Sequence, residues 1–212
     1  MTIERAGAAA LILGTLAMLG VMALHPSGVA HTPDSAKTLQ LAFVVHAVAI
    51  ASAPALTFGM FVLSRSIGFE QPAASLAFFF YLFGAIAVML AATMSGFVAT
   101  RLIESGMTEG ADQAMTHGLL RLEWQLNQAF ATLHVALFSI AIALCALCWP
   151  ERGLLAAAIQ TVGLLVGAGI FAWLVSGTLT LNVHGMGAVV LAQGLWFILA
   201  GLGLANRKPQ TE

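Results

Sequence analysis

This chain has very little charge. Of its 212 residues, only 8% are Asp, Glu, Lys or Arg, and the formal net charge is −1. Soluble domains carry about 25% charged residues, so an ordinary soluble domain is excluded. Nucleic-acid binding is excluded as well, because the basic surface that neutralises phosphates is missing.

Cysteine is also scarce. Cys145 and Cys148 are the two cysteines, and both lie near the end of an apolar run. A pair placed in this way does not make a disulfide framework. The Cys-x-x-Cys spacing occurs in redox and metal motifs, but Ala, Leu and Trp flank it here. We therefore expect two small buried side chains on one helix face.

Long polar segments are missing, and long apolar ones take their place. The longest polar stretch covers about residues 100–123, which leaves no room for a soluble domain. Six apolar segments reach the roughly 20 residues that a membrane helix needs: 6–24, 39–64, 73–99, 124–149, 153–181 and 185–205. The sequence predicts an all-α fold, a polytopic integral membrane helical bundle of about six transmembrane helices in a single domain over 1–212.

The ends and loops of the chain predict its orientation. Segment 6–24 is longer than the roughly 7–15 apolar residues of a signal peptide, so we expect it to be the first membrane helix. Positively charged residues favour the side that holds both termini, and such residues mark the cytoplasmic side. We expect both termini in the cytoplasm, a bacterial inner membrane as the location, and a short helix over 111–123 lying on the outer surface.

Histidine is the polar residue whose placement is most informative. With helices as predicted, five of the six histidines fall at the outer end: His25, His31, His46, His134 and His184. His46 and His134 lie inside apolar spans, and ionisable side chains at membrane depth are costly and usually functional. We expect these imidazoles to converge at similar depth beneath the outer surface, whereas His117 is expected to be a loop residue.

Polar neighbours accompany His134 on the fourth span. Glu123, Asn127 and His134 are spaced four and seven residues apart, so they share a helix face. Asn127 and Thr132 are expected to fix the imidazole tautomers from the second shell of a site. Glu123, or Asp34 from the first outer loop, is expected to offer a carboxylate.

Two kinds of cofactor suit this histidine pattern. His46 and His134, from facing helices with small neighbours, suit axial ligation of a haem b. Their layout on two parallel helices resembles membrane b-type cytochromes, over these two residues. His25, His46, His134 and His184, with a carboxylate, suit copper or zinc instead. The predicted function is therefore a membrane-embedded haem- or metal-binding protein with its site near the periplasmic face, serving redox chemistry or electron transfer; as an enzyme it would be an oxidoreductase.

Three other functions are compatible with the sequence. A small transporter or channel would use the histidines as proton relays. An accessory subunit of a larger membrane complex, or one chain of a homo-oligomer, would need no chemistry of its own. A membrane-embedded hydrolase would need a metal-activated water near His46, His134 and Glu123.

Overall fold

The computed structural model describes residues 1–26, 36–106 and 112–207, and within these ranges it contains helices and no strand. The elements are α1 (Ile3–Leu24), α2 (Ala36–Gly68), α3 (Pro72–Thr93), the π-helix η1 (Met94–Val98), α4 (Ala99–Gly106), α5 (Gln113–Leu147), α6 (Leu154–Val175) and α7 (Val183–Ala205). Because α3, η1 and α4 form one continuous rod, six rods are long and apolar enough to cross a membrane. The predicted all-α membrane bundle is confirmed.

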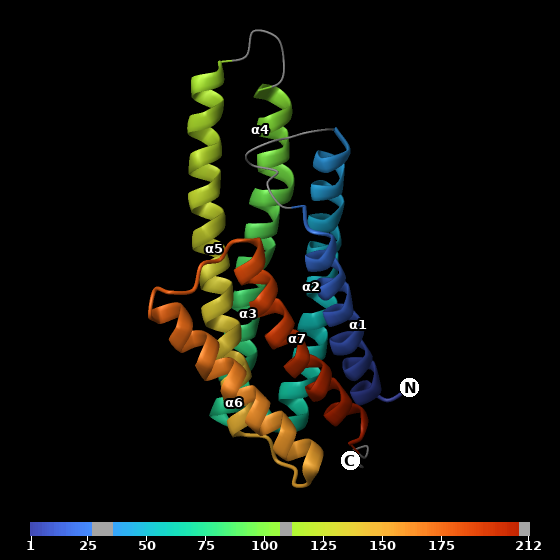
Figure 1. The fold of residues 1–212 in the computed structure, drawn as a ribbon. Coiled ribbons are helices and arrows are strands. Elements are labelled where there is room, and N and C mark those ends of the chain that lie inside the picture. The colour runs from blue at the N-terminus through green and yellow to red at the C-terminus, as the bar shows by residue number, and fades with distance from the viewer. Residues whose placement is uncertain (27–35, 107–111, 208–212) are drawn as a thin grey trace.

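Both termini lie at the same end of the bundle (Figure 1). We call this the inner end and the opposite one the outer end. Helix starts follow from capping side chains: Thr2, Asp112 and Asn182 accept a hydrogen bond from a backbone N–H in the first turn of α1, α5 and α7. Such caps satisfy amides that have no partner inside the helix. Pro72 opens α3 at a position where its missing N–H costs nothing.

The rods fall into two length classes, and the longer ones extend past the shorter ones at the outer end. Helices α1, α6 and α7 have 22–23 residues, about 33–35 Å at 1.5 Å per residue, close to the roughly 30 Å of bilayer hydrocarbon. Helix α2, the α3–α4 rod and α5 have 33–35 residues, or about 50 Å. Their upper parts rise above the outer ends of α1, α6 and α7 (Figure 1).

These extensions carry the helices beyond the limits of the predicted membrane spans. Helix α5 begins at Gln113 rather than at 124, and the α3–α4 rod runs to Gly106 rather than ending at 99. The prediction of a separate helix lying on the surface over 111–123 is therefore wrong, because from Gln113 these residues belong to α5. In the other direction α6 ends at Val175 rather than near 181, where the chain turns through Gly177 with a φ of +72°.

The main hydrophobic core lies in the inner half of the bundle. Leu11, Met60, Ile142 and Trp196 are fully buried there, on four different helices. Above them the Tyr81 ring stacks on Phe138 with ring centroids 4.3 Å apart. The two cysteines are free; Cys145 is buried in this core as expected, whereas Cys148 is only partly buried against it. Nearer the outer end the five helices α1, α2, α3, α5 and α7 separate enough to leave a cleft.

Candidate functional site

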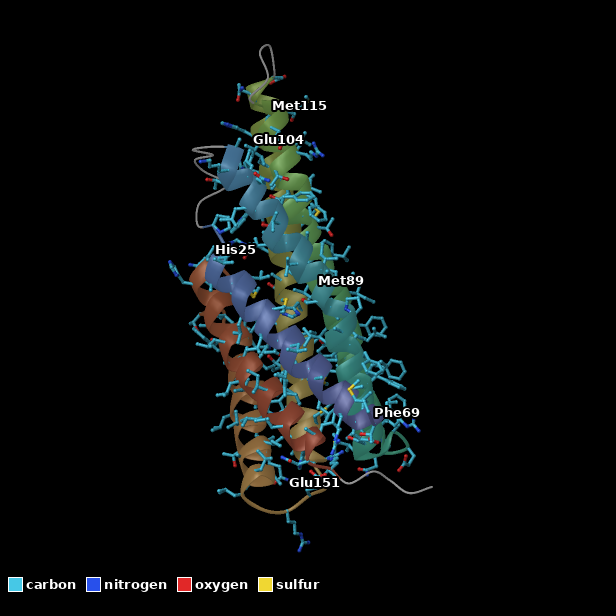
Figure 2. The ribbon with its side chains drawn as sticks, turned by 90° about the vertical axis from the view of Figure 1, so that its right-hand side faces the viewer. His25, Phe69, Met89, Glu104, Met115 and Glu151 are labelled. Atoms are coloured by element: carbon cyan, nitrogen blue, oxygen red, sulfur yellow. The ribbon has the colours of Figure 1, made fainter. Side chains whose placement is uncertain are left out.

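The outer cleft has a volume of about 330 Å³ and three histidines in its wall. His25 comes from the end of α1, His46 from α2 and His134 from α5. Figure 2 shows His25 at the outer end of α1, well below Glu104 and Met115 near the tips of the α4 and α5 extensions. The cleft therefore lies at the level where the short helices end and the long ones continue.

His25 and His46 contact each other directly. Their Nε2 atoms are 3.3 Å apart, and the ring planes meet at 74° with centroids 4.9 Å apart. Each ring is also held from behind. Nδ1 of His46 lies 2.6 Å from the carbonyl oxygen of Ala42, one turn earlier in α2, and Nδ1 of His25 lies 3.1 Å from the carbonyl oxygen of Pro26.

These contacts constrain where the protons are. A carbonyl oxygen only accepts hydrogen bonds, so an Nδ1 atom that bonds to one carries the hydrogen and donates it. A neutral imidazole has one hydrogen, so both Nε2 atoms present lone pairs. Two acceptors then face each other at 3.3 Å with no hydrogen between them. This arrangement is repulsive unless a cation binds both nitrogens, one ring is protonated, or one ring gives up its carbonyl contact and donates from Nε2 to the other ring.

Protonation of the His25 ring is disfavoured. Burial lowers the pKa of His25 below its ordinary value of 6.5, and the hydrogen bond to the Pro26 carbonyl, which acts in the opposite direction, is the smaller effect. The charged form of a buried imidazole loses hydration that the protein does not replace. A metal ion between the Nε2 atoms resolves the repulsion without a protonated ring.

Helix η1 holds His46 against the cleft from the other side. Gly96 lies in this π-helix, and a Cβ built at Gly96 would lie 2.3 Å from Cβ of His46 and 2.6 Å from its Cγ. Single π-helical turns inside α-helices occur frequently at functional sites. Gly96 is a site residue that the sequence did not reveal, since one glycine in an apolar span is indistinguishable from those used for helix packing.

His134 lies deeper than His46, contrary to the expected similar depth. Its Nδ1 lies 3.2 Å from the carbonyl oxygen of Gly84 in α3, so Nδ1 again carries the hydrogen and Nε2 the lone pair. The side chain is 3% exposed, and its ring lies edge-on to Phe138 at a centroid distance of 4.2 Å. Below it the cleft continues into a narrow space of about 40 Å³ that Thr15 and Gln193 also line.

The remaining predicted residues are distributed differently. His184 is exposed in the first turn of α7 and His117 is exposed on α5, and neither lines the cleft. His31 and Asp34 lie outside the described residues. Throughout ranges 1–26, 36–106 and 112–207, no group of three or more His, Cys, Asp or Glu side chains could hold a metal ion. The four predicted metal ligands therefore do not form one cluster, and any site must rest on fewer of them.

Of the residues expected to support the imidazoles, only some lie at the cleft. Asn127 lines the cleft. Glu123 is 5% exposed but is not part of the cleft wall. Thr132 is exposed, and its hydroxyl donates to the carbonyl oxygen of Gln128 in the preceding turn. The groups that orient the imidazoles are backbone carbonyls, which sequence cannot assign because every residue has one.

The site thus combines two imidazoles whose Nε2 atoms are 3.3 Å apart, a third imidazole in the same cleft, and backbone carbonyl oxygens that contact Nδ1 of all three rings. Comparison with known proteins adds no assignment: no protein-family model, no curated protein and no solved structure matches this chain.

Proposed function

We propose that this chain is a membrane metal-binding protein that coordinates a copper or zinc ion between Nε2 of His25 and Nε2 of His46. The observation that carries the proposal is the pair of Nε2 atoms 3.3 Å apart, with each Nδ1 atom within hydrogen-bond distance of a backbone carbonyl oxygen. In metal sites the second nitrogen of a ligating histidine commonly donates in this way, which fixes the tautomer and orients the ring.

The separation of the two nitrogens supports tetrahedral coordination. Zinc–nitrogen bonds are about 2.0–2.1 Å long, so two ligands of a tetrahedral ion stand about 3.3–3.4 Å apart. Ligands on opposite sides of an ion would stand about 4 Å apart. The observed 3.3 Å matches the first arrangement.

The ligand type narrows the choice of ion, and the cleft suggests its use. Imidazole suits zinc and copper, whereas magnesium and calcium prefer oxygen ligands. Two histidines leave coordination positions for water or for a ligand that enters the cleft, as in catalytic rather than structural sites. With copper, the site would exchange one electron between Cu(II) and Cu(I), and we propose electron transfer as its role. We also propose a bacterial inner membrane, with the cleft facing the periplasm.

A haem remains the second candidate, on a separate observation. Nε2 of His134 has no hydrogen-bond partner among the residues that the structure describes, and it shares the cleft with His46. Axial ligation of one haem b by both would require the two rings to come to the same depth, since His46 lies against Gly96 and His134 against Gly84 of the same rod. His25 disfavours this arrangement, because its Nε2 stands where the iron would have to approach His46.

Elemental analysis of the purified protein tests the proposal. We expect about one copper or zinc ion per chain in the wild type and a loss of at least ten-fold in His25→Ala and in His46→Ala, since either change removes one of two protein ligands. His184→Ala is the matched control, because its imidazole is exposed at the same end of the bundle, and it should keep the full metal content.

An absorption spectrum of the same samples separates the two candidates. A Soret band that is lost in both His46→Ala and His134→Ala but kept in His25→Ala would mean that the site binds a haem rather than a bare metal ion. Wild-type protein that contains neither metal nor haem after purification, and takes up none when copper or zinc is added, would contradict both.

A further inference from the structure

A second cavity lies at the inner end of the bundle. It has a volume of about 700 Å³ and is enclosed by the start of α1, the end of α2, the loop between α5 and α6, the start of α6 and the end of α7. Figure 2 shows Glu151, from the wall of this cavity, at the end of the bundle away from His25. The inner cavity and the outer cleft share no lining residue.

Cationic side chains outnumber anionic ones around the inner cavity. Arg65, Arg152 and Arg207 line it together with Glu4 and Glu151. Arg207 is the most enclosed of the arginines, with a side chain that is 9% exposed. Its guanidinium pairs with the Glu151 carboxylate, donates to the hydroxyl of Ser66 and lies over the Trp149 ring, 4.8 Å from the centroid.

Two buried donors in the same wall are left unused. Nη2 of Arg207 and Nε1 of Trp149 have no hydrogen-bond partner within the described part of the chain. Trp149 is 4% exposed. A buried donor without a partner loses its hydration with nothing in return, so two of them in one wall call for an acceptor.

The first turn of α6 adds backbone donors to this wall. Gly153 precedes the helix and supplies no capping side chain, and the first helical hydrogen bond runs from the Ala157 N–H to the Gly153 carbonyl. The amides of Leu154, Leu155 and Ala156 lie ahead of that bond, and all three residues line the cavity. The N-terminus of a helix carries about half a positive charge and attracts anions.

We propose that the inner cavity binds a phosphate group, either on an anionic phospholipid or free in solution. Phosphate oxygens are acceptors only, so they suit a guanidinium, an indole N–H and the amides of a helix start at once. Apolar residues such as Ile3, Val62 and Ile159 complete the wall. The mixture of cationic and apolar groups suits a lipid headgroup with the start of its acyl chains, while the donors alone suit inorganic phosphate.

Two binding measurements on the full-length protein distinguish the sources. Equilibrium dialysis in phosphate-free detergent measures binding of inorganic phosphate. Native mass spectrometry of protein released from nanodiscs of phosphatidylglycerol and phosphatidylcholine measures retention of the anionic lipid. We expect Trp149→Phe, which keeps most of the ring but removes the N–H donor, to weaken binding by roughly ten-fold or more.

Arg207→Gln should weaken binding further, but it also removes the ion pair with Glu151, so Trp149→Phe is the decisive variant. Arg101→Gln is the matched control, because Arg101 is exposed on α4 at the opposite end. Binding of inorganic phosphate would identify the free anion as a ligand of the inner cavity. Retention of phosphatidylglycerol without phosphate binding would identify the lipid headgroup as the ligand. Binding of neither overturns the proposal, as does binding that Trp149→Phe leaves unchanged or that Arg101→Gln weakens equally.

Discussion

At the scale of single residues, His46 is defined by what surrounds it on three sides. Ala42 receives its Nδ1 hydrogen, Gly96 leaves room for its ring, and His25 meets its Nε2. The side chain is 7% exposed, so these contacts leave it little freedom to rotate. A ligand held in this way needs little reordering when a metal ion binds, which favours tight binding.

Gly96→Ala tests how closely His46 must be held. The added Cβ would lie 2.3 Å from Cβ of His46, so α2 and η1 must move apart or the imidazole must shift. We expect a loss of about 1–3 kcal/mol of stability and a metal affinity at least ten-fold lower. Thermal unfolding in detergent and metal titration measure the two effects.

Gly20→Ala is the control for this change. A Cβ at Gly20 meets nothing within 4 Å, and Ala is favoured over Gly inside a helix by about 1 kcal/mol. The control should therefore be neutral or stabilising, with metal affinity unchanged. Equal metal affinity in wild type and Gly96→Ala would mean that the packing of η1 against His46 does not matter for binding.

The sequence was informative about the residues of the site but not about their partners. His25, His46 and His134 stood out because ionisable groups are rare in apolar spans, and the structure brings them to one cleft. That they bind a metal ion stays a prediction. His184 could not be ruled out in advance, since depth along a helix says nothing about which way a side chain points.

At the scale of helices, the protein is defined by three rods that are longer than a bilayer is thick. Met115, Leu119 and Leu122 are exposed on the outer extension of α5. Thr116 and Glu123, seven residues apart on one face of the same segment, are buried. The polar and charged residues of 113–123 set this segment apart from the apolar span, so the sequence predicted a separate helix rather than the start of α5.

Labelling of Met115→Cys tests both the extension and the orientation. The variant is made in a background without Cys145 and Cys148, and a membrane-impermeant maleimide is added to intact cells. We expect rapid labelling, because Met115 lies near the outer tip of α5 (Figure 2). Leu165→Cys is the control, exposed in the middle of α6 and therefore facing lipid, and it should stay unlabelled.

The other outcomes of this labelling are equally informative. Labelling of Met115→Cys only after the membrane is permeabilised would reverse the proposed orientation. Absence of labelling under both conditions would mean that this part of α5 is embedded in lipid rather than projecting from the membrane.

At the scale of the whole molecule, two cavities open toward opposite ends with a packed core between them. The packed core includes Leu11, Met60 and Ile142. Along the chain, each of them lies between a residue that lines the outer cleft or the narrow space below it and a residue that lines the inner cavity. A metal ion or phosphate bound at one end would have to pass this core to reach the other. The architecture is therefore better suited to binding at both faces than to transport through the bundle.

The six spans were predictable because bilayer thickness imposes a length and a hydropathy on each of them. The outer extensions were not, since beyond the length that a bilayer requires only capping and packing decide where a helix stops. Asp112 caps α5 twelve residues before the apolar part begins at Trp124. The inner cavity was equally hidden, because it depends on how Arg207 and Trp149 meet across the ends of two helices.

X-ray absorption spectroscopy at the metal edge of the purified protein tests the central claim most directly. The imidazole pair predicts two histidine nitrogens at about 2.0–2.1 Å from the ion, and one fewer in His25→Ala loaded with excess metal. A spectrum with sulfur ligands at about 2.3 Å, or one that is identical in wild type and His25→Ala, would contradict it.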